Sequence, residues 1–153
     1  MATLTVTHTE SLTLNGSQQG GTNTTTFTGI NEASKRMLTI TTNVATIANF
    51  SGAVGSAGHW NDGTVRYIRF TNLHGTYFVG ITLRNGSDDE FAFKLDAGQS
   101  FILCGDNSTG MELIFNATQA ATAGTITAFG PLKDITADAE SGTIQIEMFV
   151  ATT

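Results

Sequence analysis

Apolar and polar residues alternate with a period of two along much of this chain, a pattern typical of strands that place one face against a core. The strongest alternating segments are Val65–Thr71 and Tyr77–Arg84, and the last one is Thr143–Val150. In the last segment the inward positions are all apolar: Ile144, Ile146, Met148 and Val150. Strands with one apolar and one mixed face favour an antiparallel sandwich over a parallel sheet that is buried on both sides.

Weaker segments extend this pattern and bring the expected total to eight or nine short strands. They are Leu4–Leu14, Leu38–Val44, Phe91–Leu95, Phe101–Leu103, Met111–Phe115 and Gly124–Phe129. The turn Asp96-Ala97-Gly98 predicts a tight hairpin between the Phe91 and Phe101 segments. The polar stretch Asn31–Arg36 fits one helical turn.

Two segments lack the alternation. Residues 16–26 are polar and glycine-rich, which predicts either a mobile loop or an arm that orders against a partner. Residues 51–63 form a long Gly-rich loop that ends in an Asp-Gly turn signal. The whole range 1–153 is therefore expected to form a single domain, an antiparallel β-sandwich or jelly roll.

Composition narrows the possible partners. The net charge is −6, and only 13% of the residues are charged, about half the usual share. The seven Lys and Arg residues are scattered, so no basic stripe for nucleic acid is expected. The surface is expected to be neutral and rich in Thr, which suits packing against another protein. With no signal peptide and no long apolar run, we expect cytoplasmic synthesis without secretion or membrane insertion.

Candidate chemistry is sparse. Cys104 has no second cysteine to pair with and follows an apolar run, so we expect it to be buried. The three histidines have no metal-ligand spacing, and the acidic pair Asp88-Asp89 fits a solvated turn. No nucleophile or phosphate-binding motif occurs. We therefore expect no enzyme, no metal and no cofactor.

Two groups of residues are candidates for binding. Trp60 lies beside His59 and Asp62 in the Gly-rich loop, where it can cover the open end of the core, anchor a protein interface or stack on a sugar. The second group is expected on the second faces of the central strands: Tyr67, Arg69 and Phe78. Large residues on such a face predict a covered surface, hence oligomerisation or docking.

Less than half of the chain carries a resemblance to a known class. Its segments are Val65–Asn72, Val79–Leu83, Phe91–Leu103 and the final strand with Ile144-Gln145-Ile146-Glu147. In order and type they resemble small β-sandwich virion proteins of tailed bacteriophages, especially marine and cyanobacterial phages.

The resemblance implies a head or accessory protein, often a capsid decoration (cement) protein. Such a protein forms homotrimers on the capsid surface and has the major capsid protein as its partner. The alternative function is a carbohydrate- or receptor-binding module of a tail or head fibre, which would use Trp60, His59, Asp62 and Tyr77.

Overall fold

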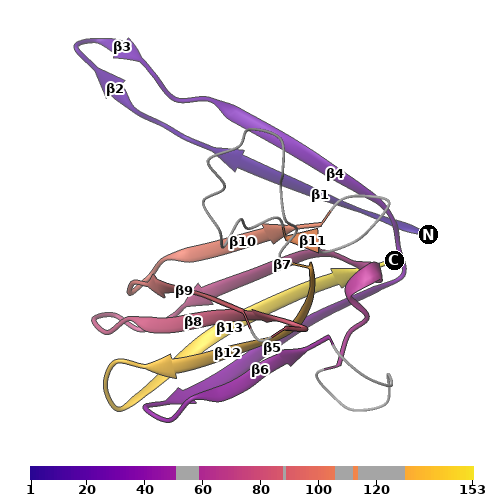
Figure 1. Cartoon of the computed structure of the whole chain (residues 1–153). Helices are drawn as coiled ribbons and strands as arrows, with labels where there is room; N and C mark the ends of the chain where they lie inside the picture. Colours follow the sequence, from indigo (N-terminus) through magenta and orange to yellow (C-terminus); the bar gives the residue numbers. More distant parts are fainter. Residues whose placement is uncertain (51–58, 88, 106–111, 114–129) are drawn as a thin grey trace, which may run out of the picture.

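Two antiparallel sheets face each other as a sandwich, and a two-stranded arm projects beside them (Figure 1). The computed structural model describes residues 1–50, 59–87, 89–105, 112–113 and 130–153. We call the sheet nearer to the arm the arm-side sheet. Its order is β10 (Ser100–Cys104), β7 (Val65–Asn72), β13 (Thr143–Thr152) and β5 (Glu32–Thr41).

The opposite sheet contains β6 (Ala45–Asn49), β12 (Gly130–Ala139), β8 (Val79–Asn85) and β9 (Glu90–Leu95), in that order. The short β11 (Glu112–Leu113) pairs with the start of β12. A 3-10 turn, η1 (Asp62–Thr64), precedes β7. The predicted all-β, antiparallel sandwich is confirmed.

The core lies between the inner faces of the two sheets. All four inward positions predicted for the last strand are at most 1% exposed, which confirms its period-two pattern. They meet apolar residues of the opposite sheet, including Val79, Ile81, Leu83 and Ile135. Since a buried aliphatic side chain contributes about 1.5–3 kcal/mol, this layer is the main source of stability.

Strand β13 joins distant parts of the chain. It pairs with β5 over its whole length, from Thr143 opposite Thr41 to Thr152 opposite Glu32, and with β7 on its other edge. The first and last strands of the sandwich are therefore neighbours.

The predicted hairpin at residues 91–103 is wrong. Strand β9 pairs with β8, whereas β10 pairs with β7, so the turn between them carries the chain from one sheet to the other. Gly98, with φ of 74°, makes this corner, and the Gln99 N–H donates to the Asp96 carbonyl at 3.1 Å. The rings of Phe93 and Phe101 lie 4.0 Å apart between their centroids across the corner. The turn residues predicted correctly that the chain reverses here, but not that the two flanking strands belong to different sheets.

Other expectations for the strands also change. The helical turn at Asn31–Arg36 is wrong, because β5 runs through it in register with β13. Strands β6 and β12 were not predicted. The expected strand at Gly124–Phe129 lies outside the described residues, and of Met111–Phe115 only β11 lies within them.

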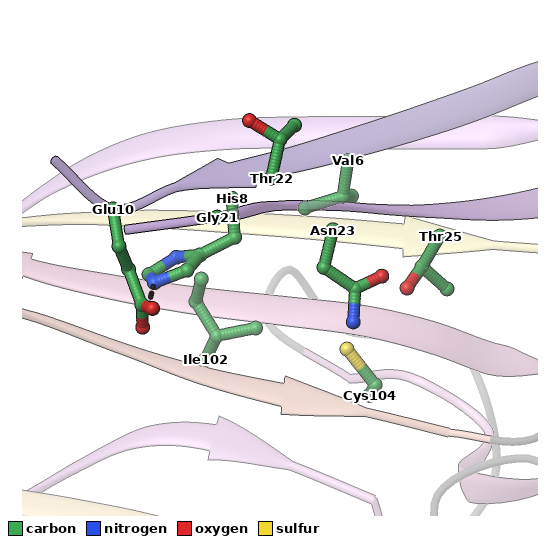
Figure 2. A pocket seen from close by; sticks show the side chains of 9 residues that line it. All are labelled: Val6, His8, Glu10, Gly21, Thr22, Asn23, Thr25, Ile102 and Cys104. Atoms are coloured by element: carbon green, nitrogen blue, oxygen red, sulfur yellow. Dashed lines mark ion pairs between the residues drawn. The ribbon is translucent and has the colours of Figure 1, made fainter. Parts of the chain in front are cut away.

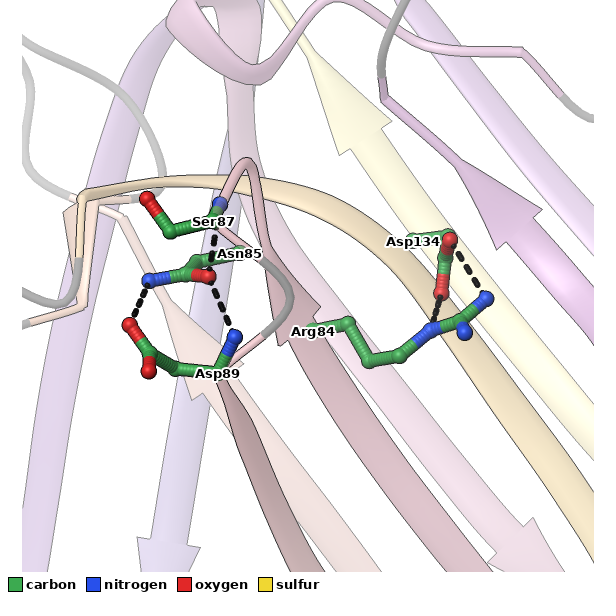
Figure 3. Close-up of polar contacts among 5 residues, drawn as sticks. All are labelled: Arg84, Asn85, Ser87, Asp89 and Asp134. Carbon is green, nitrogen blue, oxygen red and sulfur yellow. Dashed lines mark hydrogen bonds and ion pairs between the residues drawn. The ribbon is translucent and has the colours of Figure 1, made fainter.

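Buried asparagines close the turns that follow β7 and β8. The Asn85 Oδ1 accepts from the N–H groups of Ser87 and Asp89 at 2.9 and 2.8 Å, and its Nδ2 donates to the Asp89 carboxylate (Figure 3). Beside this turn Arg84 forms two bonds to Asp134 across the strands, at 2.7 and 2.8 Å. Asn72 has the corresponding role after β7. These amides replace the ladder bonds that the backbone loses where a strand ends.

Candidate interface: the N-terminal arm and the clefts beneath it

The N-terminal 30 residues form a long hairpin, which we call the arm. It pairs β1 (Ala2–Thr9) with β4 (Thr22–Ile30) and ends in a small tip, β2 (Thr13–Leu14) with β3 (Ser17–Gln18). Within the described residues, β1 and β4 pair only with each other and join neither sheet of the sandwich. The range 16–26, for which a mobile loop or an arm was predicted, contains β3 and the first half of β4.

Threonines cover the face of the arm that points away from the sandwich. Cross-strand pairing sets Thr5 opposite Thr26, Thr7 opposite Thr24 and Thr9 opposite Thr22. The hydroxyls of the last two pairs lie 3.4 and 3.3 Å apart. β-Branched side chains in such cross-strand pairs favour the extended backbone, which explains why this polar segment forms a strand. The result is an exposed face without charge.

The base of the arm packs on the outer face of the arm-side sheet. Phe27 is 2% exposed and lies against Tyr67, with ring centroids 6.2 Å apart. Tyr67 in turn contacts the ring of Phe149, and Ile30 and Ala151 complete this second cluster. Burial raises the pKa of the Tyr67 hydroxyl above its usual value. The chain's own arm therefore covers Tyr67, which was predicted on a covered second face.

Further from its base the arm stands over two clefts. The first, of about 470 Å³, lies between His8, Glu10, Asn23 and other residues of the arm and Ile102 and Cys104 of β10 (Figure 2). The second, of about 560 Å³, has these lining residues: Leu4, Thr5, Val6, Thr7, Lys35, Tyr67, Arg69, Ser100, Ile102 and Phe149. Both clefts include Val6 and Ile102, so they adjoin each other under the arm.

Three charged side chains line or border the second cleft. The Lys35 Nζ lies 2.7 Å from Glu147, and Arg69 bonds to the other carboxylate oxygen of the same residue. Lys35 foremost, and then Arg69, hold the pKa of Glu147 below its ordinary value. Two cations around one anion leave a local charge of +1 on a protein whose net charge is −6.

The tip of the arm carries two exposed leucines. Leu12 and Leu14 are 55% and 56% exposed. At the root of the tip the Glu10 N–H donates to the Gly21 carbonyl at 2.8 Å. A Cβ atom at Gly20 would lie 2.0 Å from the Glu10 carbonyl oxygen and collide with it. The two sides of the hairpin therefore approach closely here, and this position requires glycine.

Trp60 is a core residue in this structure. It is 7% exposed, its ring centroid lies 6.2 Å from that of Phe50, and the Arg36 guanidinium stacks over it at 4.9 Å. Of the three roles considered for Trp60, this burial fits the cover over the core. His59 is half-buried and forms a single bridge to Asn49, while the side chain of Asp62 lies outside what the structure describes.

The remaining aromatic candidates lie in the loop before β8. Phe78 is half-buried, and the Lys94 ammonium lies 4.7 Å from its ring centre. Because β8 begins at Val79, Phe78 does not lie on the second face of a strand. Tyr77, named for the glycan-binding alternative, is 40% exposed and stacks on His74 with centroids 5.0 Å apart. The structure therefore does not bring Trp60, Tyr67, Arg69 and Phe78 together in one site; Arg69 and Tyr67 alone share the second cleft.

Cys104 was predicted to be buried and is exposed. It follows the parity of Ser100 and Ile102 on edge strand β10, so it points out of the sandwich towards the arm. Partial desolvation there raises the pKa of its thiol. Sequence reasoning also missed Leu12, Leu14 and Ile102 as surface residues. The shared parity of Leu4, Val6, Leu12 and Leu14 was the available signal that one face of the arm is apolar.

No group of three His, Cys, Asp or Glu side chains suited to hold a metal occurs among the residues that the structure describes. In the same part of the chain, no helix is long and apolar enough to cross a membrane. Comparison of the chain with protein-family models, with curated proteins and with solved structures finds no match.

Proposed function

We propose that this chain is a non-enzymatic structural protein of a tailed-bacteriophage virion. In this role it is a decoration (cement) protein that binds the major capsid protein on the capsid surface and stabilises the shell as a homotrimer. The observation that carries the proposal is the arm. It is a projecting hairpin with an uncharged threonine face, two edges that pair with no sheet of the described sandwich, and clefts beneath it.

These features support assembly for physical reasons. An unpaired strand edge presents a row of N–H and C=O groups to a partner, and soluble proteins usually protect such edges with Lys, Pro or a covering element. Residues 1–30 contain no Lys, no Arg and no Pro. A neutral threonine face also loses little hydration energy when another protein covers it, compared with a charged face.

Repetition converts weak contacts into stable attachment. On a shell, a trimer binds through several identical contacts at once, and each further contact is intramolecular once the first has formed. Contacts of modest strength are therefore enough for a cement function.

The alternative is a glycan- or receptor-binding module of a fibre. Burial of Trp60 removes its principal sugar platform, and the exposed Tyr77 stacked on His74 is the remaining candidate. Glycan-array binding that is lost in Tyr77→Ala and retained in Tyr67→Phe would favour this alternative.

The test of the proposed function is quantitative mass spectrometry of purified virions. A copy number comparable to that of the major capsid protein supports decoration, whereas a handful of copies indicates a tail or fibre protein. Absence from virions overturns the proposal. A second measurement adds the purified protein to undecorated shells and follows their heat resistance, which should rise as the protein binds.

A further inference from the structure

We infer that the tip of the arm of one copy seats in the cleft beneath the arm of the next copy, so that three copies close a ring. This inference rests on the self-association in the proposed function and names the surfaces that carry it. The donor surface is the tip with Leu12 and Leu14, and the acceptor surface is the pair of adjoining clefts around Val6 and Ile102.

The two surfaces match in their apolar chemistry. More than half of each tip leucine is exposed in the single chain, and Ile102 is 39% exposed in the cleft. The cleft adds Leu4 and Val6 from β1 and Phe149 from β13. Burial of exposed leucine and isoleucine side chains against one another is favourable, because it removes apolar surface from water.

The charges match as well. Glu10 at the root of the tip is the only acidic residue before Glu32, and 71% of its side chain is exposed. The part of the acceptor cleft nearer to the base of the arm carries Lys35 and Arg69 around the carboxylate of Glu147, a local excess of one positive charge, while the acceptor's own His8 and Glu10 line the other part. A docked tip brings the acidic group of one copy towards the cationic rim of the next, which favours a second copy of this chain as the occupant.

The geometry also fits the closed ring. The tip is the part of the arm farthest from the sandwich, while the cleft lies beside β10 (Figure 1). Donor and acceptor are thus different patches of the same chain. An interface between two different patches is heterologous; its repetition produces a ring when the rotation closes, as in the trimer proposed here, and an open filament when it does not.

A complementation experiment tests this arrangement. The tip variant L12S/L14S retains an intact cleft, and the cleft variant I102K retains an intact tip; all three substituted positions are exposed. Each variant alone should require about tenfold or more higher concentration for half-association, measured by analytical ultracentrifugation. The two variants mixed should form a heterodimer, because one competent interface remains between them. Val44→Ser, at a 70% exposed position between β5 and β6, is the matched control and should associate like the wild type.

Cross-linking provides a second measurement that does not depend on weakened association. Cys104 is the single native cysteine and lies in the cleft. In Leu14→Cys, a short bis-maleimide should join the tip of one copy to Cys104 of the next and produce covalent dimers and closed trimers. The same variant with Cys104→Ala, and Val44→Cys with Cys104 retained, should give neither product.

Two results overturn the inference. The first is that the tip variant and the cleft variant both form trimers as readily as the wild type. The second is that Leu14→Cys forms the trimer but gives no cross-linked product. The two proposals fail separately. Tip and cleft variants that associate normally while the protein is abundant in virions overturn only the ring contact. A ring that forms as described in a protein that is absent from virions overturns only the decoration function.

Discussion

Asn72 allows a quantitative test of how the end of β7 is held. Its side chain is fully buried, and its Nδ2 donates to the carbonyls of Tyr77 and Leu95 at 2.9 and 3.1 Å. Its Oδ1 accepts from the N–H of His74 at 2.9 Å. One amide thus ties the loop after β7 to the end of β9.

In Asn72→Ala these three bonds are lost. Each contributes about 1 kcal/mol net, and the Leu95 carbonyl is left buried without this partner, while the two loop groups can regain water. We expect a loss of about 3 kcal/mol in the free energy of unfolding, equivalent to roughly 6–12 °C in Tm. Urea denaturation followed by the fluorescence of Trp60, the single tryptophan, measures this directly.

Asn43→Ala is the control, because Asn43 is exposed in the turn after β5 and its replacement should change stability by less than about 0.5 kcal/mol. Asn72→Asp adds a pH test. A carboxylate that faces two carbonyls in the core is disfavoured, so its pKa is raised in the folded state. The variant should therefore gain stability as the pH falls through that raised value. A loss below about 0.5 kcal/mol in Asn72→Ala, with an unchanged urea m-value, would refute this account of the site.

Three further predictions concern the arm, the ion pairs and the core. Phe27→Ala should release the arm from Tyr67, with faster hydrogen exchange of the β1 and β4 amides, whereas Thr26→Ala on the opposite face should leave exchange nearly unchanged. Since Lys35 and Arg69 lower the pKa of Glu147, its contribution to stability is present above the ordinary glutamate pKa and is lost as the pH falls through the lowered value. Glu147→Gln should flatten this loss in urea midpoints measured between about pH 6 and 3. Trp60→Ala should lower stability by about 3–5 kcal/mol, measured by urea denaturation followed by circular dichroism; a stable variant would contradict its assignment to the core.

Alternation along the chain was enough to predict the strands that have one apolar face directed towards the core. Strands β7 and β13 have an apolar face towards the core, and their period-two patterns identify them directly. Strand β12 was missed because Pro131, Lys133, Asp134 and Asp138 interrupt its apolar residues. Its Asp134 is stabilised in the sheet by the pair with Arg84, a contact 50 residues away that no local pattern contains.

The candidate site was only partly predictable for a similar reason. Tyr67 and Arg69 were placed on a second face correctly, but the element that covers Tyr67 comes from residues that resemble a polar loop. The threonines of β4 form a strand because β1 lies opposite them in register. The sequence left three roles open for Trp60, and its burial depends on Phe50 and Arg36. Long-range pairing decided each of these outcomes.

The position of β13 has a consequence for the order of events during synthesis. Ala151 and Phe149, on which the base of the arm packs, belong to β13, and β13 also separates β5 from β7. When synthesis has reached residue 140, the arm lacks the Phe149 and Ala151 part of its seat, and β5 and β7 lack the strand between them. Docking of the arm therefore waits until β13 has been made. A chain that stops short of β13 leaves its arm unanchored and its core open, in the state most prone to aggregation.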